Sequence, residues 1–324
     1  MNIGILGTGA FGIALAITAL KNKNQITMWT KFEDEYDMLI EYRKNIKVLP
    51  DVTIPTEIDI TLNIEKCVKD KDLIIIVVPS NTYNDVCNEL TKYINQNQII
   101  CIASKGIYEG KFLSEIAKKY LKNNIAVISG PSFAIDLISN KPIGLSIASE
   151  NDNTNKKIIK AFENNNLNLI ETNDVIGIQI CGTIKNAFAI GSGILNGLNC
   201  LESTKASYLT KCLSDTRKFL KDMGYNENTV LEYAGIGDLI LTCNSLKSRN
   251  FNYGNLIGSK ANSTEIEIFK TNNLIEGIYA LKEIYNISKQ KGAGIHTIDL
   301  IYNIVFNNEE PETLLGFINE KSKF

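Results

Sequence analysis

The sequence predicts an α/β protein with a doubly wound parallel sheet in its first half and helices alone in its second. Two patterns carry this prediction. Apolar strand-like runs alternate with helical segments up to about residue 172, which is typical of β-α-β units. From Asn173 onward the patterns are helical. We therefore expect a Rossmann-type domain over residues 1–172 and an all-helical domain over residues 173–324.

The strands expected in the first domain are short and end at glycine, proline or polar residues. One of them is a continuous apolar run that ends at Pro79, as expected for a central parallel strand covered on both faces. The expected elements are a strand at Asn2–Leu6, a mostly buried helix at Phe11–Lys21, a strand at Gln25–Thr30, a charged helix from Glu33 to about Lys44, and strands at Leu73–Val78, Ile99–Ala103 and Ile125–Ile128.

Polar segments separate the helices expected in the second half. Asn173 or Asp174 can cap the first of these helices. The Asn-rich stretches Glu150–Asn155 and Asn164–Asn168, which precede it, are expected to be surface loops or strand links. The helical segments include Gly182–Leu195, Leu209–Met223 and Ile275–Gln290.

Composition excludes several classes of protein. The 324 residues are 44% hydrophobic and 22% charged, the balance of a soluble globular protein. A net charge of −2 gives no electrostatic reason to expect nucleic acid or an acidic membrane as a partner. The longest strongly apolar run has six residues, far fewer than the roughly 20 that span a bilayer. Met1 leads directly into a strand, which leaves no room for a targeting peptide, so we expect a cytoplasmic protein.

The cysteines and the histidine limit the chemistry. Seven cysteines without a CxxC pair suit reduced thiols, and they suit neither a disulfide framework nor a zinc site. His296 is the only histidine, which excludes a multi-His metal centre and argues against a Ser-His-Asp triad. We therefore expect no metal, and proton transfer would fall to Lys, Asp, Glu, Tyr or Cys.

A glycine-rich turn follows the first strand and opens the first helix. Residues 7–12 read GTGAFG, the GxGxxG pattern of dinucleotide-binding turns. In this pattern Gly7 permits the tight turn, Gly9 lets the pyrophosphate approach the backbone, and Gly12 lets the helix and strand pack closely. The alternative is that the glycines serve only a tight turn. The strand before them and the helix after them favour dinucleotide binding.

The end of the second strand bears on the choice between NAD and NADP. An acid there hydrogen-bonds the ribose 2′-hydroxyl, whereas a cation can accept a 2′-phosphate. Here the strand ends in Trp29-Thr30-Lys31, and no acid occurs before Glu33. This slightly favours NADP, although Lys31 could equally be a solvated surface lysine.

Three successive strands end in residues that can serve a ligand. These ends read VPS at residues 78–80, ASKG at 103–106 and SGPSFA at 129–134. Ligands of open α/β sheets bind at the carboxyl ends of the strands, so we expect Lys105 to point into the same crevice. Each end alone could be a plain strand-to-helix turn. Their coincidence favours a site.

Two segments of the helical half carry reactive side chains. Lys185 lies on an otherwise apolar helix, where a snorkelling side chain is the usual explanation and a desolvated acid or base the alternative. Residues 235–250 read GIGDLILTCNSLKSRN and place Asp238 and Thr242 one helical turn apart. Ser248-Arg249-Asn250 follow. This combination suits a small substrate with hydroxyl or carbonyl groups at one end and an anion at the other.

Taken together, eight motifs resemble the bacterial type of NAD(P)-dependent glycerol-3-phosphate dehydrogenase, and they occur in order over most of the chain. They are GxGxxG at 7–12, VVPS at 77–80, SKGI at 104–107, SGPSFA at 129–134, IKNAFAIGSG at 184–193, STKA at 203–206, GIGDLILTC at 235–243 and SRN at 248–250.

The resemblance implies reversible reduction of dihydroxyacetone phosphate to sn-glycerol 3-phosphate by NAD(P)H, with NADPH slightly favoured, feeding glycerophospholipid synthesis. It implies that Lys185 is the general acid/base, assisted by Lys105, and that Asp238 and Thr242 orient it and hold the substrate hydroxyls. The implied substrate contacts are Lys105, Gly130, Ser132, Lys185, Asp238, Ser248, Asn250 and Arg249, the last holding the phosphate. The implied cofactor contacts are Gly7, Gly9, Ala10, Phe11, Gly12, Lys31, Lys105, Ala134, Arg249, Leu274 and Glu276.

Two other functions stay open at this point. A different β-hydroxyacid or acyl dehydrogenase could share both domains, but such enzymes usually rely on a histidine or on a differently placed lysine. A non-catalytic dinucleotide sensor would need the glycine turn but not the lysine, aspartate and arginine together. The expected partner is the small-molecule substrate, without nucleic acid and without stable membrane insertion. A homodimer is one option for the oligomeric state, which the sequence does not determine.

Overall fold

The computed structural model describes residues 1–139, 141–164 and 166–319, which belong to two compact units. The first unit comprises residues 1–105 and 111–175, and the second comprises residues 106–110 and the chain from residue 176 onward. The short segment Gly106–Gly110 therefore groups with the second unit, although it directly follows Lys105 of the first.

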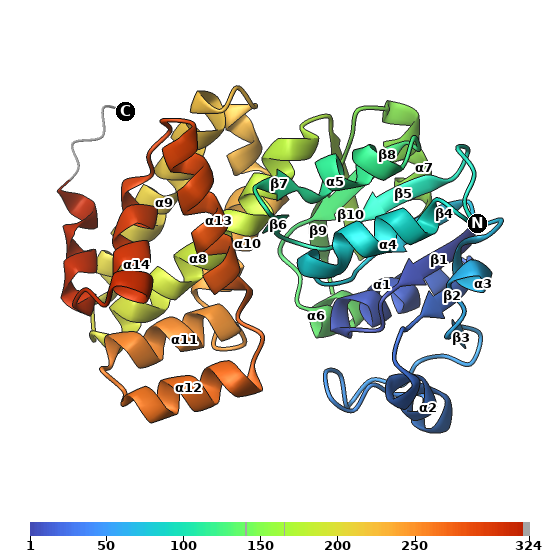
Figure 1. The fold of residues 1–324 in the computed structure, drawn as a ribbon, viewed down its shortest axis with the longest axis horizontal. Coiled ribbons are helices and arrows are strands. Elements are labelled where there is room, and N and C mark those ends of the chain that lie inside the picture. Colours follow the sequence, from blue (N-terminus) through green and yellow to red (C-terminus); the bar gives the residue numbers. More distant parts are fainter. Residues whose placement is uncertain (140, 165, 320–324) are drawn as a thin grey trace. The chain divides into compact units, whose positions relative to one another are not determined.

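Strands and short helices alternate through the first unit (Figure 1). Its elements are β1 (Asn2–Leu6), α1 (Ala10–Leu20), β2 (Gln25–Trp29), α2 (Glu33–Tyr42), β3 (Asp59–Thr61), α3 (Ile64–Val68), β4 (Leu73–Ile76), the 3₁₀ turn η1 (Ser80–Thr82), α4 (Tyr83–Leu90), β5 (Ile99–Ile102), β7 (Lys111–Phe112), α5 (Leu113–Tyr120), β8 (Ile125–Ser129), α6 (Ala134–Ile138), β9 (Ile143–Ser149), α7 (Asp152–Phe162) and β10 (Leu167–Thr172).

Eight of these strands form one sheet in the order β10-β9-β8-β5-β4-β1-β2-β3. Helices α1, α6 and α7 pack together on one face, and α4 and α5 pack together on the other. The prediction of a doubly wound Rossmann-type sheet is confirmed. One pairing in the sheet is not parallel. Strand β9 pairs antiparallel with β8, whereas the pairings β1–β2, β1–β4, β4–β5 and β5–β8 are parallel.

The central strands are apolar on both faces because helices cover both sides of the sheet. All four residues of β4 are buried, and Ile75 lies between Ile5 of β1 and Cys101 of β5 in the register of the sheet. This burial explains why the sequence of β4 shows a continuous apolar run and no alternation. The parallel register also brings the carboxyl ends of these strands to one edge.

The Asn-rich stretches were only partly interpreted correctly. The loop expected at Glu150–Asn155 is wrong, because α7 begins at Asp152. The Asn151 side chain accepts hydrogen bonds from the N–H groups of Asn153 (3.0 Å) and Thr154 (3.3 Å), so this asparagine caps the helix. Strands β3, β9 and β10 were not predicted.

The second unit is helical apart from the two-residue strand β6. Its elements are β6 (Ile107–Tyr108), α8 (Val175–Gly197), α9 (Glu202–Asp222), the 3₁₀ turn η2 (Glu227–Leu231), the π-helical turn η3 (Tyr233–Gly237), α10 (Asp238–Cys243), α11 (Arg249–Gly258), α12 (Ser263–Asn272), α13 (Glu276–Gln290), α14 (His296–Asn307) and the 3₁₀ helix η4 (Pro311–Ile318).

Helix α8 forms the core of the second unit. Among the described residues it is the one helix long and apolar enough to cross a membrane by length and composition, yet 94% of that stretch is buried inside the protein. Its glycines allow α11 to approach its backbone. A Cβ on Gly193 of α8 would lie 2.0 Å from the carbonyl oxygen of Phe251, and a Cβ on Gly254 of α11 would lie 1.9 Å from that of Ile190.

Candidate active site

One edge of the sheet in the first unit gathers the predicted strand-end motifs. Strands β1, β4, β5 and β8 are parallel neighbours, so the segments that follow them start from the same edge. The Ser104 hydroxyl donates to the carbonyl of Val78 (2.6 Å) and ties the ends of β4 and β5 together. Lys105 is half-buried beside it, and Gly130 and Ser132 follow β8. The predicted convergence of these strand ends is confirmed, whereas their contact with substrate stays a prediction.

The glycine turn has the geometry that a dinucleotide needs. Gly7 has a φ of +120°, and a Cβ there would lie 2.5 Å from the carbonyl oxygen of Val77. A Cβ on Gly12 would lie 2.4 Å from the carbonyl oxygen of Gly7, so glycine is needed for close packing. A Cβ on Gly9 would meet nothing within 4 Å, and no side chain caps α1 there. The turn is therefore open where a pyrophosphate would approach the first N–H groups of the helix.

The other predicted cofactor residues of the first unit lie on the same few elements. Ala10 and Phe11 form the start of α1, and Ala134 is the first residue of α6, which packs against α1. All three are partly accessible. Lys31 lies two residues after the end of β2 and is exposed, and Thr30 between them is buried. Their contact with a dinucleotide stays a prediction.

A buried cluster in the second unit brings together Lys185 of α8 with Asp238 and Thr242 of α10. The Lys185 Nζ donates to Asp238 Oδ1 (2.6 Å) and to Thr242 Oγ1 (2.8 Å). The side chains of the lysine and the aspartate are only 9% and 1% exposed. The side chain of Lys185 is therefore largely buried and paired with a carboxylate, which contradicts the snorkelling explanation. The catalytic roles of the three residues stay predictions.

Local structure explains why these side chains meet. The π-helical turn η3 leads directly into α10, whose first residue is Asp238. Thr242 lies four residues later and on the same face of the helix, since its hydroxyl is 3.4 Å from Asp238 Oδ1. Lys185 comes from the middle of α8 and is surrounded by buried neighbours such as Ile184 and Phe188.

The Ser-Arg-Asn motif forms the N-terminal end of α11. Ser248 is the N-cap, and its side-chain oxygen accepts a hydrogen bond from the N–H of Phe251 (3.2 Å). Arg249 is exposed and makes no hydrogen bond or ion pair within the described ranges of the chain. Asn250 is buried. Arg249 is thus an exposed cation on the first residue of α11, the end of the helix where the dipole also favours an anion.

Sequence reasoning missed Asn186, which connects three predicted site segments. Asn250 Nδ2 donates to Asn186 Oδ1 (3.0 Å), and the N–H of Gly277 donates to Asn250 Oδ1 (2.9 Å). This chain joins α8, next to Lys185, with the starts of α11 and α13. The predicted cofactor residues Leu274 and Glu276 are exposed just before Gly277. The position of Asn186 directly after Lys185 was the signal that could have found it.

The buried cysteines are not candidates for catalysis. Burial raises the pKa of the Cys243 thiol, beside Thr242, and raises the pKa of Cys101 to about 12. These thiols stay protonated near neutral pH and are poor nucleophiles. Nor does the part of the chain that the structure describes contain a group of three or more His, Cys, Asp or Glu side chains that could hold a metal ion.

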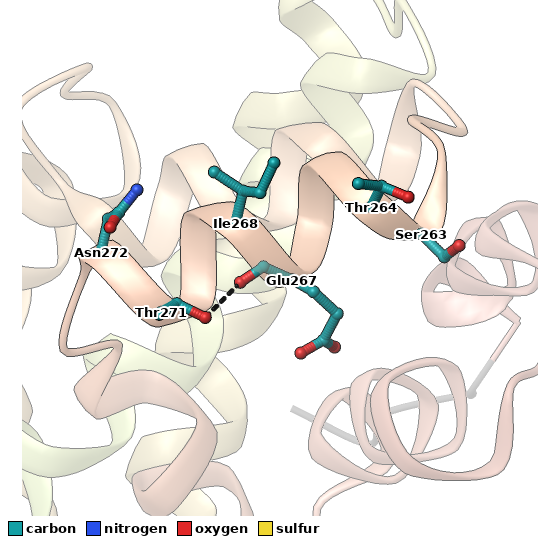
Figure 2. A pocket seen from close by; sticks show the side chains of 6 residues that line it. All are labelled: Ser263, Thr264, Glu267, Ile268, Thr271 and Asn272. Atoms are coloured by element: carbon teal, nitrogen blue, oxygen red, sulfur yellow. Dashed lines mark hydrogen bonds between the residues drawn. The ribbon is translucent and has the colours of Figure 1, made fainter.

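A pocket on the outer side of α12 does not suit the predicted substrate. Its volume is about 430 Å³, and Figure 2 shows the side chains that line it. They include one carboxylate and no cation, so the pocket has no group to neutralise a phosphate, and it contains none of the predicted site residues. The lining residues are Ser263, Thr264, Glu267, Ile268, Thr271 and Asn272.

Comparison with known proteins bears on both units. Residues 2–155 match the family model described as the N-terminus of NAD-dependent glycerol-3-phosphate dehydrogenase, and residues 174–316 match that of its C-terminus. The chain is 34% identical to a glycerol-3-phosphate dehydrogenase [NAD(P)+] of Thermoanaerobacter sp. (strain X514), covering 96% of this chain and 94% of the relative. It is 32% identical to the enzyme of the same name from Clostridium botulinum (strain Alaska E43 / Type E3), with the same coverage.

A solved structure agrees with these sequence matches. The crystal structure of glycerol-3-phosphate dehydrogenase from Coxiella burnetii superposes with a TM-score of 0.92 at 26% identity and covers 99% of both chains. The two family matches together span both units with the motifs in their expected order. The chain therefore belongs to the NAD-dependent glycerol-3-phosphate dehydrogenase family and is an NAD(P)-dependent oxidoreductase.

Proposed function

We propose that Lys185 is the general acid of this chain in the reaction of its family, the NAD(P)H-dependent reduction of dihydroxyacetone phosphate to sn-glycerol 3-phosphate. The contact of its Nζ with Asp238 at 2.6 Å is the observation that carries the proposal. A nearby carboxylate favours the protonated amine, which is the form that a general acid requires. Burial removes competing water and strengthens the attraction between the ammonium and a developing oxyanion.

The chemistry divides between the cofactor and the side chains. A bound reduced nicotinamide supplies the hydride that C2 of the substrate receives. Lys185 donates a proton to the carbonyl oxygen as negative charge develops there, and Lys105 assists by its positive charge. Asp238 and Thr242 hold the amine at a defined position and accept from the substrate hydroxyls. In the oxidation direction Lys185 is the proton acceptor.

Arg249 is proposed to hold the substrate phosphate. Its planar guanidinium matches two phosphate oxygens, and its place at the start of α11 adds the favourable end of the helix dipole. The buried Asn250 fixes that helix end through its hydrogen bonds to Asn186 and Gly277. Ser248 can donate its hydroxyl to the phosphate while its oxygen caps the helix. Gly130 and Ser132 are proposed as further substrate contacts.

The proposed cofactor is NAD(P)H, with NADPH slightly favoured. Gly7, Gly9, Gly12 and the start of α1 at Ala10 and Phe11 would hold the pyrophosphate. The further proposed cofactor contacts are Lys31, Lys105, Ala134, Arg249, Leu274 and Glu276.

Substitution of Lys185 tests the proposal. Lys185→Ala is expected to lower turnover by about 10²–10⁴-fold, the usual contribution of general acid–base catalysis. Lys211→Ala is the matched control, because Lys211 also forms a buried pair with an aspartate, Asp215 at 2.7 Å, but lies outside the proposed site. Absorbance of the reduced nicotinamide with dihydroxyacetone phosphate measures both. Near-normal turnover of Lys185→Ala contradicts the mechanism.

The same assay separates the other functions. A dehydrogenase for a β-hydroxyacid would oxidise NADPH with the corresponding β-keto acid but not with dihydroxyacetone phosphate, and a non-catalytic sensor would oxidise it with neither. Arg249→Ala should chiefly raise the KM for dihydroxyacetone phosphate. Arg217→Ala is the control, because Arg217 of α9 pairs with Glu227, the first residue of η2 (3.5 Å), and neither belongs to the proposed site.

The cellular role is a further part of the proposal. The product would supply the glycerol phosphate backbone of phospholipids, and the reaction would take place in the cytoplasm, where its substrate and cofactor are available. A homodimer is the oligomeric state to test first. Light scattering of the purified protein measures it directly.

A further inference from the structure

The glycine turn is held from one side by an asparagine from a distant loop. Asn45 Nδ2 donates to the carbonyl oxygen of Thr8 (3.0 Å), the residue between Gly7 and Gly9. Asn45 and Thr8 are each 2% exposed, and the bond between them is buried. A side-chain donor therefore fixes the backbone of the turn at its second residue.

Asn45 is itself held in one orientation. Its Nδ2 also donates to Glu35 Oε1 (2.9 Å) in the first turn of α2, and its Oδ1 accepts from the N–H of Lys47 (3.2 Å). Two acceptors beside the nitrogen and one donor beside the oxygen define which way the amide faces. The other oxygen of Glu35 accepts from the hydroxyl of Thr30, which directly follows β2. Asn45 and Glu35 thus connect the glycine turn to the end of β2.

The loop that carries Asn45 has a defined shape. It comprises residues 43–58, between α2 and β3, and hydrogen bonds join its two ends. The N–H of Ile54 donates to the carbonyl of Arg43 (2.7 Å), and Arg43 Nη2 donates to the carbonyl of Ile58 (2.8 Å). Within the loop, the N–H of Leu49 donates to the carbonyl of Asn45 (2.8 Å). These contacts allow Asn45 to hold the turn at a fixed position.

The contact with Asn45 sets the orientation of the peptide between Thr8 and Gly9. In a planar trans peptide the carbonyl and the N–H point in opposite directions. With the Thr8 carbonyl directed at Asn45, the N–H of Gly9 is directed away from it. Gly9 is also the open position of the turn, since a Cβ there would meet nothing within 4 Å. Its own carbonyl accepts from the N–H of Ile13 (3.0 Å), which fixes the next peptide.

We propose that Asn45 is a positioning residue for the dinucleotide cofactor, because it keeps the Thr8–Gly9 peptide in the orientation that presents an N–H to the pyrophosphate. Rotation of this peptide by half a turn would present a carbonyl oxygen instead, which repels phosphate. Glycine at position 9 has few backbone restrictions and permits that rotation unless another group prevents it. The inference rests on the proposed role of the glycine turn in pyrophosphate binding.

The effect should be equal for NADH and NADPH. Both cofactors carry the pyrophosphate, and they differ only at the ribose 2′-position. The exposed charges just after β2, Lys31 and Glu33, are unchanged when Asn45 is replaced. A positioning role at the pyrophosphate therefore predicts weaker binding of both cofactors at an unchanged ratio.

Asn45→Ala tests the inference. One hydrogen bond corresponds to about a three- to tenfold change in an equilibrium, and the apparent affinity falls with the fraction of protein in the binding-competent state. The KM values for NADH and NADPH should each rise by about this factor, whereas kcat should change by less than about twofold. Lys185 and its partners lie in the other unit and are not altered. Titration calorimetry with NADH alone should give the same loss of affinity without catalysis.

Asn24→Ala is the matched control. Asn24 is also buried, at 6% exposure, and its Nδ2 also donates to two acceptors, the carbonyls of Ala19 (2.7 Å) and Ala161 (2.9 Å). It lies beyond the C-terminal end of α1, away from the glycine turn. Its variant should be destabilised in thermal unfolding but should keep both KM values. Asn45→Ser replaces the alanine variant should that fail to fold. The serine hydroxyl can still accept from the N–H of Lys47 but is one bond too short to hold Thr8.

Gly9→Ala tests the turn separately from Asn45, because its Cβ meets no protein atom within 4 Å and obstructs only a ligand. A rise of both KM values in Gly9→Ala without a rise in Asn45→Ala overturns the positioning role and leaves the role of the turn intact. A rise in Asn45→Ala that is confined to one cofactor, or that Asn24→Ala matches, also overturns it. Unchanged KM values in Gly9→Ala show that the pyrophosphate binds elsewhere, and the inference then fails together with the proposed cofactor site.

Discussion

The contact between α8 and α11 makes a sharp prediction for Gly254→Ala. A Cβ on Gly254 would lie 1.9 Å from the carbonyl oxygen of Ile190, where ordinary contact begins near 3.4 Å. The obstacle is backbone, so no side-chain rotation can relieve it. Gly258 repeats the contact one turn later, with a Cβ 2.1 Å from the carbonyl oxygen of Ile194. Helix α11 must therefore move away from α8 by roughly 1.5 Å, or bend.

The expected cost follows from two opposing terms. Alanine is favoured over glycine inside a helix by about 1 kcal/mol. Overpacking of a well-packed interior costs about 1–3 kcal/mol, and a backbone obstacle on a buried helix belongs at the upper end. The net destabilisation is about 2 kcal/mol. For a unit of this size it lowers the melting temperature by about 5 °C.

The displacement should also affect the proposed site, because α11 begins at Arg249. Thermal unfolding followed by circular dichroism measures the stability, and the KM for dihydroxyacetone phosphate should rise more than kcat falls. Gly316→Ala in η4 is the matched control, since the nearest atom to its new Cβ is 3.9 Å away. A Gly254→Ala protein that melts within 1 °C of the unmodified protein, or no lower than the control, would refute this reasoning.

Three further predictions concern side chains of the second unit, two of them buried and one partly accessible. Asp238→Ala leaves the buried ammonium of Lys185 without its carboxylate and should cost about 3–5 kcal/mol by urea unfolding, whereas an exposed pair would cost under 1. Tyr208→Phe removes the hydrogen bond to the carbonyl of Phe188 (3.0 Å) and should cost about 1 kcal/mol in the same measurement. Alkylation of the native protein at pH 8 should modify Cys200 first, because it alone among the cysteines is partly accessible. Cys200→Ser should then abolish the fast phase.

The sequence predicted the first unit well because the patterns that define its glycine turn and its central strands lie within short segments. The turn at residues 7–12 joins a strand to a helix within a dozen residues, and its glycines are explained by contacts with Val77 and with the turn itself. Strand β4 was recognised because burial on both faces leaves an uninterrupted apolar run. Asn151 was misread as a loop residue. The tendency of asparagine to bond nearby backbone N–H groups serves loops and helix caps alike.

The sequence alone was less able to identify the edge strands. The buried and exposed residues of β10 alternate only over its first part, and Asn168 within it suggests a loop. The antiparallel pairing of β9 with β8 has no local signature. Such pairing depends on which strand edges remain free once the central strands have assembled.

By itself, the sequence determined the fold class, the family and the order of the candidate site residues, because each of these rests on short motifs. Only the tertiary structure decided the state of Lys185. Its partner Asp238 lies 53 residues away in the sequence, and the burial that makes their contact strong arises from the packing of α8 against α10. The same holds for Asn186, whose role depends on side chains that folding brings together from separate elements.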